Sequence, residues 1–182
     1  MRCLTDKEVS EWLAEHSIPE DPYRGESAPV HYLQFYPPSA YRRLDAFVRN
    51  YHLLIIPDSE AMVHMTDWGL FQPSEMIAIM GIRSSSEENR LLIHAPGHLL
   101  NSEEAETGIS LFSLSASFAW SSYLYCPKQR STLYNWEGDI FDFWTDCATM
   151  MDQMKLLLKQ FELAETTQGE LGADGKASPA IA

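Results

Sequence analysis

The clearest hydrophobic pattern in the chain lies between residues 145 and 161. Apolar side chains recur there at every third or fourth position, the spacing that places them on one face of an α-helix. The pattern predicts an amphipathic helix that packs on a core, with Thr145 or Asp146 as its N-cap. The apolar stripe consists of Cys147, Met150, Met151, Met154, Leu157, Leu158 and Phe161.

Three other segments carry signals of a helix start. Thr5 and Glu8 have the spacing of a capping box, in which each side chain accepts a hydrogen bond from the other residue's backbone N–H. Pro73 fits the first turn of a helix, where a missing N–H does no harm. The predicted helices cover residues 6–16, a segment capped by Ser39 with Leu44, Phe47, Val48 and Tyr51 on its inner face, and residues 73–83.

Residues 90–126 form the segment on which the rest of the chain is expected to pack. The apolar run 91–93 predicts a short buried strand, which Pro96 and Gly97 stop. Asn101 has the features of an N-cap, and it predicts a helix to about residue 118 with a second buried strand at 122–126. Part of this segment also alternates between apolar residues and serine, so one long strand over 109–125 is the alternative.

Turn residues separate several further apolar or alternating runs, which predict strands. The runs at 51–56 and 61–68 are expected to pair as a hairpin. Together the elements predict a single α+β domain over residues 1–165, with a mixed, mostly antiparallel sheet and helices packed on it. Residues 166–182 are rich in Gly, Ala and Thr and predict a disordered tail. The predicted strands cover residues 31–36, 51–56, 61–68, 122–126, 131–136 and 140–144.

Charge and cysteine usage limit the partners and the compartment. The chain has 182 residues and a net charge of −13. Nucleic acids and anionic membranes are unexpected partners, because both are bound through concentrated Lys and Arg. A basic protein is the partner that such a field attracts. Three cysteines without a CxxC pair, a charged N-terminus and the lack of a long apolar stretch predict a cytoplasmic protein.

His94 and His98 are the most suggestive pair for chemistry, because with Glu103 nearby they could hold a divalent metal. Their spacing spans a Pro-Gly turn, however, and lacks the helix and the glutamate of HExxH. A turn with a hydrogen-bonded histidine is the favoured interpretation. The sequence contains no P-loop, GxGxxG or GxSxG, so we assign no catalytic residue, no metal and no cofactor.

The stretch 131–154 combines aromatic residues with acids and contains no Lys or Arg. Aromatic anchors with an acidic rim are suited to a basic partner. Strand alternation directs residues 141 and 143 to the core and residues 142 and 144 outward. The alternative is that both tryptophans are core residues and the acids are ordinary solvated positions. The predicted partner-binding residues are Trp136, Glu137, Asp139, Asp142 and Trp144.

These observations favour a non-enzymatic binding module that masks a basic surface of another protein. Small acidic cytoplasmic domains without cofactor motifs are frequent among inhibitors, including immunity proteins that neutralise secreted toxins. That association rests on composition and architecture and not on a motif. The alternatives are a small hydrolase or metal-dependent enzyme with a site near His94, His98 and Glu103, and a structural subunit of a larger assembly.

Overall fold

The computed structural model describes residues 1–20, 22–23, 29–56, 59–69 and 71–166. These residues form an α+β domain built on one seven-stranded antiparallel sheet, with the strand order β1-β4-β3-β5-β6-β7-β2. The predicted fold class is therefore confirmed. The strands are β1 Arg2–Leu4, β2 His31–Phe35, β3 Ala61–Asp67, β4 Gly97–Leu100, β5 Ser121–Cys126, β6 Ser131–Trp136 and β7 Ile140–Thr145.

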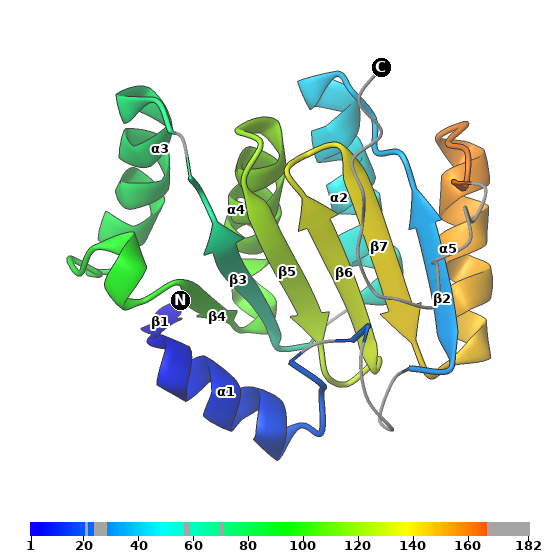
Figure 1. Cartoon of the computed structure of the whole chain (residues 1–182), viewed down its shortest axis with the longest axis horizontal. Helices are drawn as coiled ribbons and strands as arrows, with labels where there is room; N and C mark the ends of the chain where they lie inside the picture. The colour runs from blue at the N-terminus through cyan, green and yellow to red at the C-terminus, as the bar shows by residue number, and fades with distance from the viewer. Residues whose placement is uncertain (21, 24–28, 57–58, 70, 167–182) are drawn as a thin grey trace.

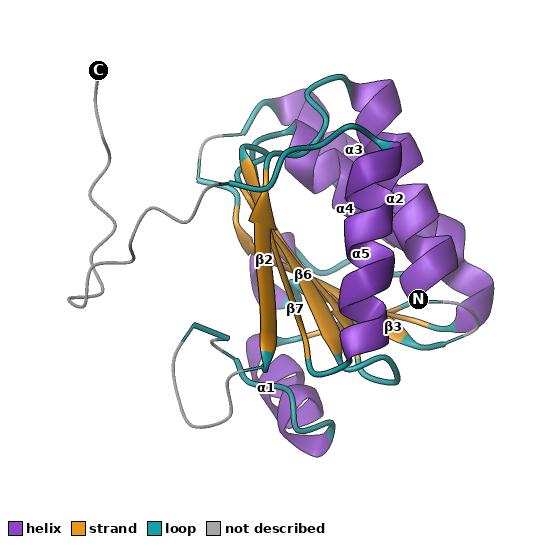
Figure 2. Ribbon diagram, turned by 90° about the vertical axis from the view of Figure 1, so that its right-hand side faces the viewer, coloured by secondary structure: helices purple, strands orange, loops and turns teal. Residues whose placement is uncertain are grey.

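The helices lie on both sides of this sheet. Four of them, α2 to α5, lie on one side, and α1 lies on the other side near one end (Figures 1 and 2). We call the side that carries α2 to α5 the helix face and the opposite side the open face. The helices are α1 Asp6–Glu15, α2 Tyr41–Ile55, α3 Pro73–Ser84, α4 Ala105–Ser117 and α5 Ala148–Gln160, with short 3-10 turns at Leu92–His94 and Ser102–Glu104.

The predicted helix starts are confirmed in α1 and α3 and corrected in α5. Thr5 and Glu8 form the capping box of α1, and Pro73 is the first residue of α3. The helix α5 begins at Ala148 after Cys147 as N-cap, because Thr145 is still part of β7 and pairs with β2 and β6. The apolar stripe of α5 is buried as predicted at Met151, Met154, Leu157 and Leu158.

The predicted strand at 51–56 is wrong, because α2 continues to Ile55. Tyr51 and Ile55 are both fully buried and stand four residues apart, so they extend the inner face of the helix. The expected hairpin is absent from the described residues, where β3 pairs with β4 and β5 instead. The N-cap of α2 is Ala40 and not Ser39, and no side chain caps it.

The predicted strand at 91–93 is also wrong. Leu91 and Ile93 are exposed and only Leu92 of that run is buried, in a 3-10 turn. The strand is β4, and it begins at Gly97, where the sequence signals a turn. A Cβ on Gly97 would lie 2.5 Å from Cγ2 of Val9 and 3.1 Å from Cβ of Leu4, so the glycine admits α1 and β1 close to β4.

The segment that follows Asn101 is a helix and then a strand, which excludes the alternative of one long strand over 109–125. The expected capping box of Asn101 and Glu104 is present. The strands β4 and β5 both pair antiparallel to β3, which lies between them. Buried serines tie α4 to the sheet, since Oγ of Ser115 and Oγ of Ser122 lie 2.7 Å apart.

Two hydrophobic clusters lie on the two faces of the sheet. The larger one fills the helix face between the sheet and α2, α4 and α5. The smaller one lies under α1 and joins Val9, Trp12 and Leu13 to Met62 and Tyr125 of the sheet. Among the described helices, only α1 lies on the open face, where it covers one end and packs on Met62 of β3 and Tyr125 of β5 (Figure 1).

The last described residues extend the edge of the sheet beside β2. Glu165 forms a β-bridge with Phe35, and the backbone N–H of Thr166 donates to the carbonyl of Gln34 at 2.9 Å. Thr166, which composition assigns to the tail, is thus attached to the sheet. The rest of the predicted disordered tail, residues 167–182, lies outside the described residues.

Candidate interaction surface

The register of the sheet identifies the side chains of the open face. Residues paired across neighbouring strands point to the same side, and side chains alternate along each strand. Phe141 and Phe143 point into the helix-face core and are fully buried, as predicted. The residues that alternate with Phe141 and Phe143 along β7 therefore point to the open face, together with the residues that pair with them on the neighbouring strands. They include Tyr123 and Tyr125 of β5, Thr132, Tyr134 and Trp136 of β6, Asp142 and Trp144 of β7, and Tyr32 and Gln34 of β2.

Three tyrosine rings lie nearly parallel on the open face, and we call them the tyrosine stack. The ring centroids of Tyr123 and Tyr134 are 4.3 Å apart with 23° between the planes. Those of Tyr123 and Tyr125 are 5.2 Å apart at 8°. Tyr125 is buried beneath α1, whereas Tyr123 and Tyr134 are half-buried. The neighbouring Trp136 is 44% exposed, so aromatic surface on this face meets solvent.

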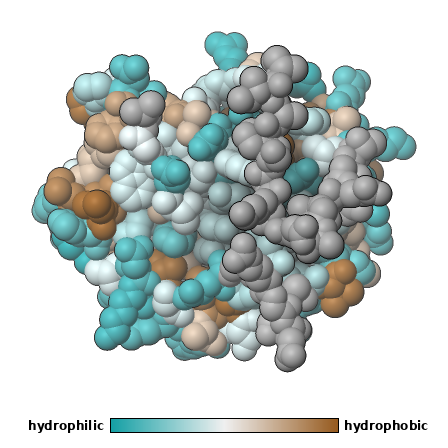
Figure 3. Space-filling view, in the orientation of Figure 1, coloured by the Kyte–Doolittle hydropathy of each residue, from teal (hydrophilic) through white to brown (hydrophobic). Residues whose placement is uncertain are grey.

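Three acidic residues influence Tyr134, the last ring of the tyrosine stack. Burial raises the pKa of Tyr134, and the carboxylates close enough to raise it further are those of Asp142, Asp67 and Glu137. Asp67 ends β3, which lies beside β5, and Glu137 belongs to the turn between β6 and β7. In the space-filling view of the open face (Figure 3), a pale surface of intermediate hydropathy is visible to the left of the grey atoms, with hydrophilic and hydrophobic residues around it.

The β6–β7 turn holds its acids in a fixed place. Glu137 and Gly138 have φ values of 51° and 77°, and Asp139 N–H donates to the carbonyl of Trp136 at 3.0 Å. Positive φ at both central residues is what a type I′ turn requires. A Cβ on Gly138 would lie 2.2 Å from the carbonyl oxygen of Ala116, so the turn packs directly against the end of α4.

Asp142 is fully buried, although it points to the open face. Its carboxylate accepts hydrogen bonds from the Tyr32 hydroxyl at 2.6 Å, from Nε2 of Gln34 at 2.8 Å and from the Tyr23 hydroxyl. Burial and the Asp142 carboxylate together raise the pKa of Tyr23 and Tyr32 well above that of free tyrosine. The carboxylate is thus satisfied within the fold and is not accessible for direct contact with a partner.

Trp144 is buried in the same way and is only 3% exposed. Its ring meets Tyr23 edge-on at a centroid distance of 4.8 Å and Tyr32 at 5.5 Å. Of the five residues predicted to bind a partner, three are exposed together at the β6–β7 turn and two lie under tyrosines. Sequence reasoning missed Tyr123 and Asp67, which only the pairing of β3, β5 and β6 brings to the turn.

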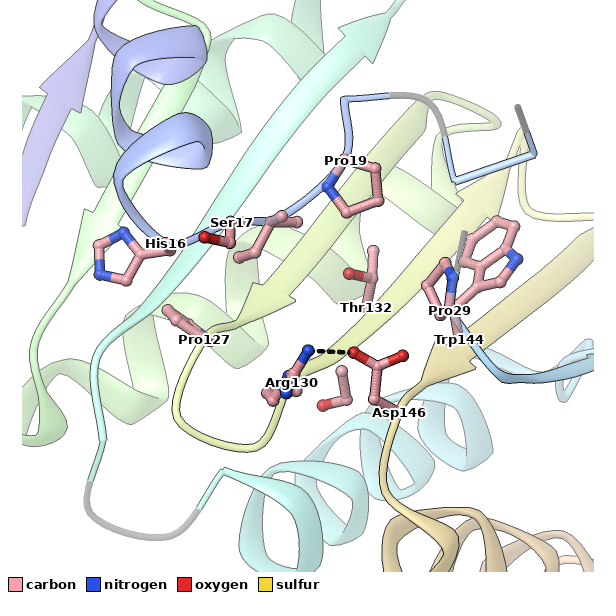
Figure 4. Close-up of a pocket in the computed structure, with 11 residues that line it drawn as sticks. His16, Ser17, Pro19, Pro29, Pro127, Arg130, Thr132, Trp144 and Asp146 are labelled. Carbon is pink, nitrogen blue, oxygen red and sulfur yellow. Dashed lines mark ion pairs between the residues drawn. The ribbon is translucent and has the colours of Figure 1, made fainter. Parts of the chain in front are cut away.

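A pocket of about 370 Å³ lies at the opposite end of the open face, between the end of α1 and the β5–β6 turn (Figure 4). Its walls include the ring of Trp144 and three prolines. Arg130 and Asp146 form an ion pair across it at 2.6 Å, and Asp146 also accepts from the Val30 N–H at 3.1 Å. The charged groups of this pocket therefore neutralise each other.

The structure does not bring His94 and His98 together. The side chain of His94 is exposed, whereas His98 is fully buried. Nδ1 of His98 lies 3.2 Å from the Val63 carbonyl, and its Nε2 lies 2.9 Å from Nη1 of Arg83. Because Arg83 can only donate, Nε2 accepts and His98 is neutral. Burial and Arg83 lower its pKa to about 3.

Glu103 is exposed in the 3-10 turn Ser102–Glu104 before α4, where its backbone N–H donates to Oδ1 of Asn101. Among the described residues, no group of three or more His, Cys, Asp or Glu side chains is placed to hold a metal ion. In the same part of the chain, no helix is both long and apolar enough to cross a membrane. Comparison with protein-family models, curated proteins and solved structures finds no match.

Proposed function

We propose that this chain is a protein-binding module, immunity- or inhibitor-like, that masks a basic surface of a partner protein. The supporting observation is the exposed part of the open face, where aromatic rings lie beside acids that form no ion pair with another described residue. We call this the acidic aromatic surface and define it as Tyr123, Tyr134, Trp136, Asp67, Glu137 and Asp139.

The surface contains both kinds of residue that protein interfaces use. Aromatic side chains supply most of the binding energy, and charged side chains raise the association rate. Exposed aromatic side chains become anchors when a partner excludes water from them, and truncating such an anchor costs about 2 kcal/mol or more of binding. Trp136 is the most exposed ring of the surface. The rim acids Glu137 and Asp139 add an attractive field, which acts mainly on the association rate and is screened within about 10 Å at 0.1 M salt.

Some of the acids elsewhere on the chain are already paired with a cation. Several other acids are paired with arginines, as Glu106 is with Arg49, Glu88 with Arg90 and Asp146 with Arg130. All three cysteines are unpaired, which fits a reducing compartment such as the cytoplasm. The hydrolase alternative gains no support, because His94, His98 and Glu103 do not converge on one pocket.

The test begins with a partner captured from the native host and measures association rates over a range of salt concentrations. The variant Glu137→Gln with Asp139→Asn should slow association and flatten its salt dependence. The matched control is Glu103→Gln with Asp152→Asn, which changes the net charge equally but lies on the helix side, where both residues are exposed. An acidic partner, or equal effects of both double variants, would refute masking at this surface.

Trp136→Ala should change the dissociation rate. Loss of a desolvated anchor speeds dissociation, so the affinity should fall by about 2 kcal/mol or more with the association rate nearly unchanged. Tyr41→Ala on α2 removes an aromatic ring that is 50% exposed on the helix side and serves as the control. Unaltered dissociation of the Trp136 variant would exclude this residue as an anchor.

A further inference from the structure

The acidic aromatic surface contains the elements needed to recognise one kind of side chain. Tyr134 stacks on Tyr123 in a nearly parallel arrangement and is the last ring of the tyrosine stack. Tyr134 is half-buried, so part of its side chain is packed against neighbours and part meets solvent. Asp67 pairs with Ser121, two residues before Tyr123 in β5, and Glu137 begins the turn that follows β6, so the sheet register brings both exposed carboxylates to the same end of the sheet as Tyr134.

These two carboxylates have free capacity to bind a cation. Asp67 accepts a hydrogen bond from the backbone N–H of Gly69 at 2.9 Å. Within the described part of the chain, neither Asp67 nor Glu137 forms an ion pair, in contrast to Glu106, Glu88 and Asp146. A cation placed on the ring of Tyr134 would therefore meet negative charge that the fold does not already neutralise.

Arginine and lysine side chains differ in how well they bind to an aromatic ring that has carboxylates at its edge. A guanidinium is planar and weakly hydrated, so it can lie flat on an aromatic ring while its N–H groups bind carboxylates at the ring's edge. An ammonium is compact and strongly hydrated, and it gives up more hydration to reach the same position. Cations over aromatic rings gain stabilisation that grows as water is excluded.

We propose that the acidic aromatic surface takes an arginine side chain of the basic partner, with the guanidinium stacked on Tyr134 and paired with Asp67 and Glu137. The inference rests on the proposed function and specifies the chemistry of its binding site. It requires a preference for arginine over lysine at equal charge, which general acidity does not provide.

The experiment measures binding of two capped peptides to the full chain by calorimetry at low salt. One peptide contains four arginines in a Gly-Ser background, and the other contains four lysines at the same positions. The arginine peptide should bind at least about threefold more tightly, which is the factor expected if the strongly hydrated ammonium fails to make the exposed cation–π contact that the guanidinium makes. Equal affinities, or no binding of either peptide at millimolar concentration, would overturn the inference.

Variants of Tyr134 locate the preference. Tyr134→Leu should reduce the arginine-to-lysine ratio to about one, whereas Tyr134→Phe should keep it, because the phenyl ring is retained. Circular dichroism melts of both variants show whether they are folded, and Tyr41→Leu on α2 is the control for loss of an exposed ring. If Tyr134→Leu is unfolded, Asp67→Asn provides the second test, and it should weaken the arginine peptide more than the lysine peptide. A ratio that survives in a folded Tyr134→Leu, or equal losses with Asp67→Asn, contradicts the assignment.

The peptide measurements distinguish a failure of arginine recognition from a failure of the proposed binding surface. If both peptides bind equally and both are weakened by Glu137→Gln with Asp139→Asn, the acidic surface is retained as a binding site and arginine recognition is rejected. If those substitutions weaken neither peptide more than Glu103→Gln with Asp152→Asn does, the proposed binding surface is rejected as well.

Discussion

Trp144 and Trp136 lie on the same face of the sheet, but replacement by alanine should destabilise the fold much more at Trp144 than at Trp136. Trp144 is 3% exposed, and Tyr23 and Tyr32 pack against it. Full burial of an aromatic side chain removes about 200 Å² from water, which at about 25 cal/mol per Å² corresponds to an upper limit of about 5 kcal/mol. Measured costs of such truncations are about 3–5 kcal/mol, and we expect that loss for Trp144→Ala.

Trp136 is 44% exposed, so its replacement removes less buried area and leaves a gap that opens to solvent. We expect Trp136→Ala to cost no more than about half of the loss at Trp144, a difference of about 2 kcal/mol between the two variants. Urea unfolding followed by far-UV circular dichroism measures both, because removal of a tryptophan changes the fluorescence signal itself. Equal unfolding free energies would refute the reasoning, since they would mean that Tyr23 and Tyr32 do not cover Trp144.

Three other predictions concern residues that are packed inside the fold or against it. His98 is neutral in the fold with a pKa near 3, whereas an unfolded histidine has a pKa of about 6.5, so the unfolded state binds the extra proton between these values. Stability should therefore fall as the pH decreases below about 6.5, by up to about 1.4 kcal/mol per pH unit from this group, and His98→Gln should flatten the slope measured by unfolding at pH 4 to 7. Gly138→Ala should destabilise by more than about 1 kcal/mol, since its Cβ would overlap the Ala116 carbonyl at a positive φ, and an unchanged melting temperature would exclude that contact. Leu157→Ala should cost about 2–5 kcal/mol in denaturant unfolding, because Leu157 is fully buried in the stripe of α5, and a loss below about half a kcal/mol would show that the helix is not packed.

The sequence was sufficient where one periodic signal had no competitor, as in α5 and in the capped start of α1. It was insufficient at 51–56, where a short apolar run has no period that separates a buried strand from the last turns of a helix. Gly97 shows a second limit. Glycine signals a turn in a sequence, but here it allows α1 to approach a strand, and that contact comes from residues about ninety positions away.

The candidate surface was predictable only in part for a related reason. Glu137 and Asp139 belong to a tight turn, which a local pattern identifies as exposed. Strand alternation gives the side of the sheet to which Asp142 and Trp144 point, but it does not show that Tyr23 and Tyr32 cover them. Those tyrosines come from the N-terminal part of the chain, and long-range packing of this kind leaves no trace in local periodicity.

The strand order has a consequence for how the chain folds. The two outermost strands, β1 and β2, come from the first 35 residues, but their partners β4 and β7 are made much later. During synthesis the N-terminal third therefore has no sheet to join until the middle and the end of the domain have emerged. Such non-local pairing slows folding and leaves unpaired strands open to wrong partners. We expect the central strands to assemble first and the first-made segments to close the two edges last.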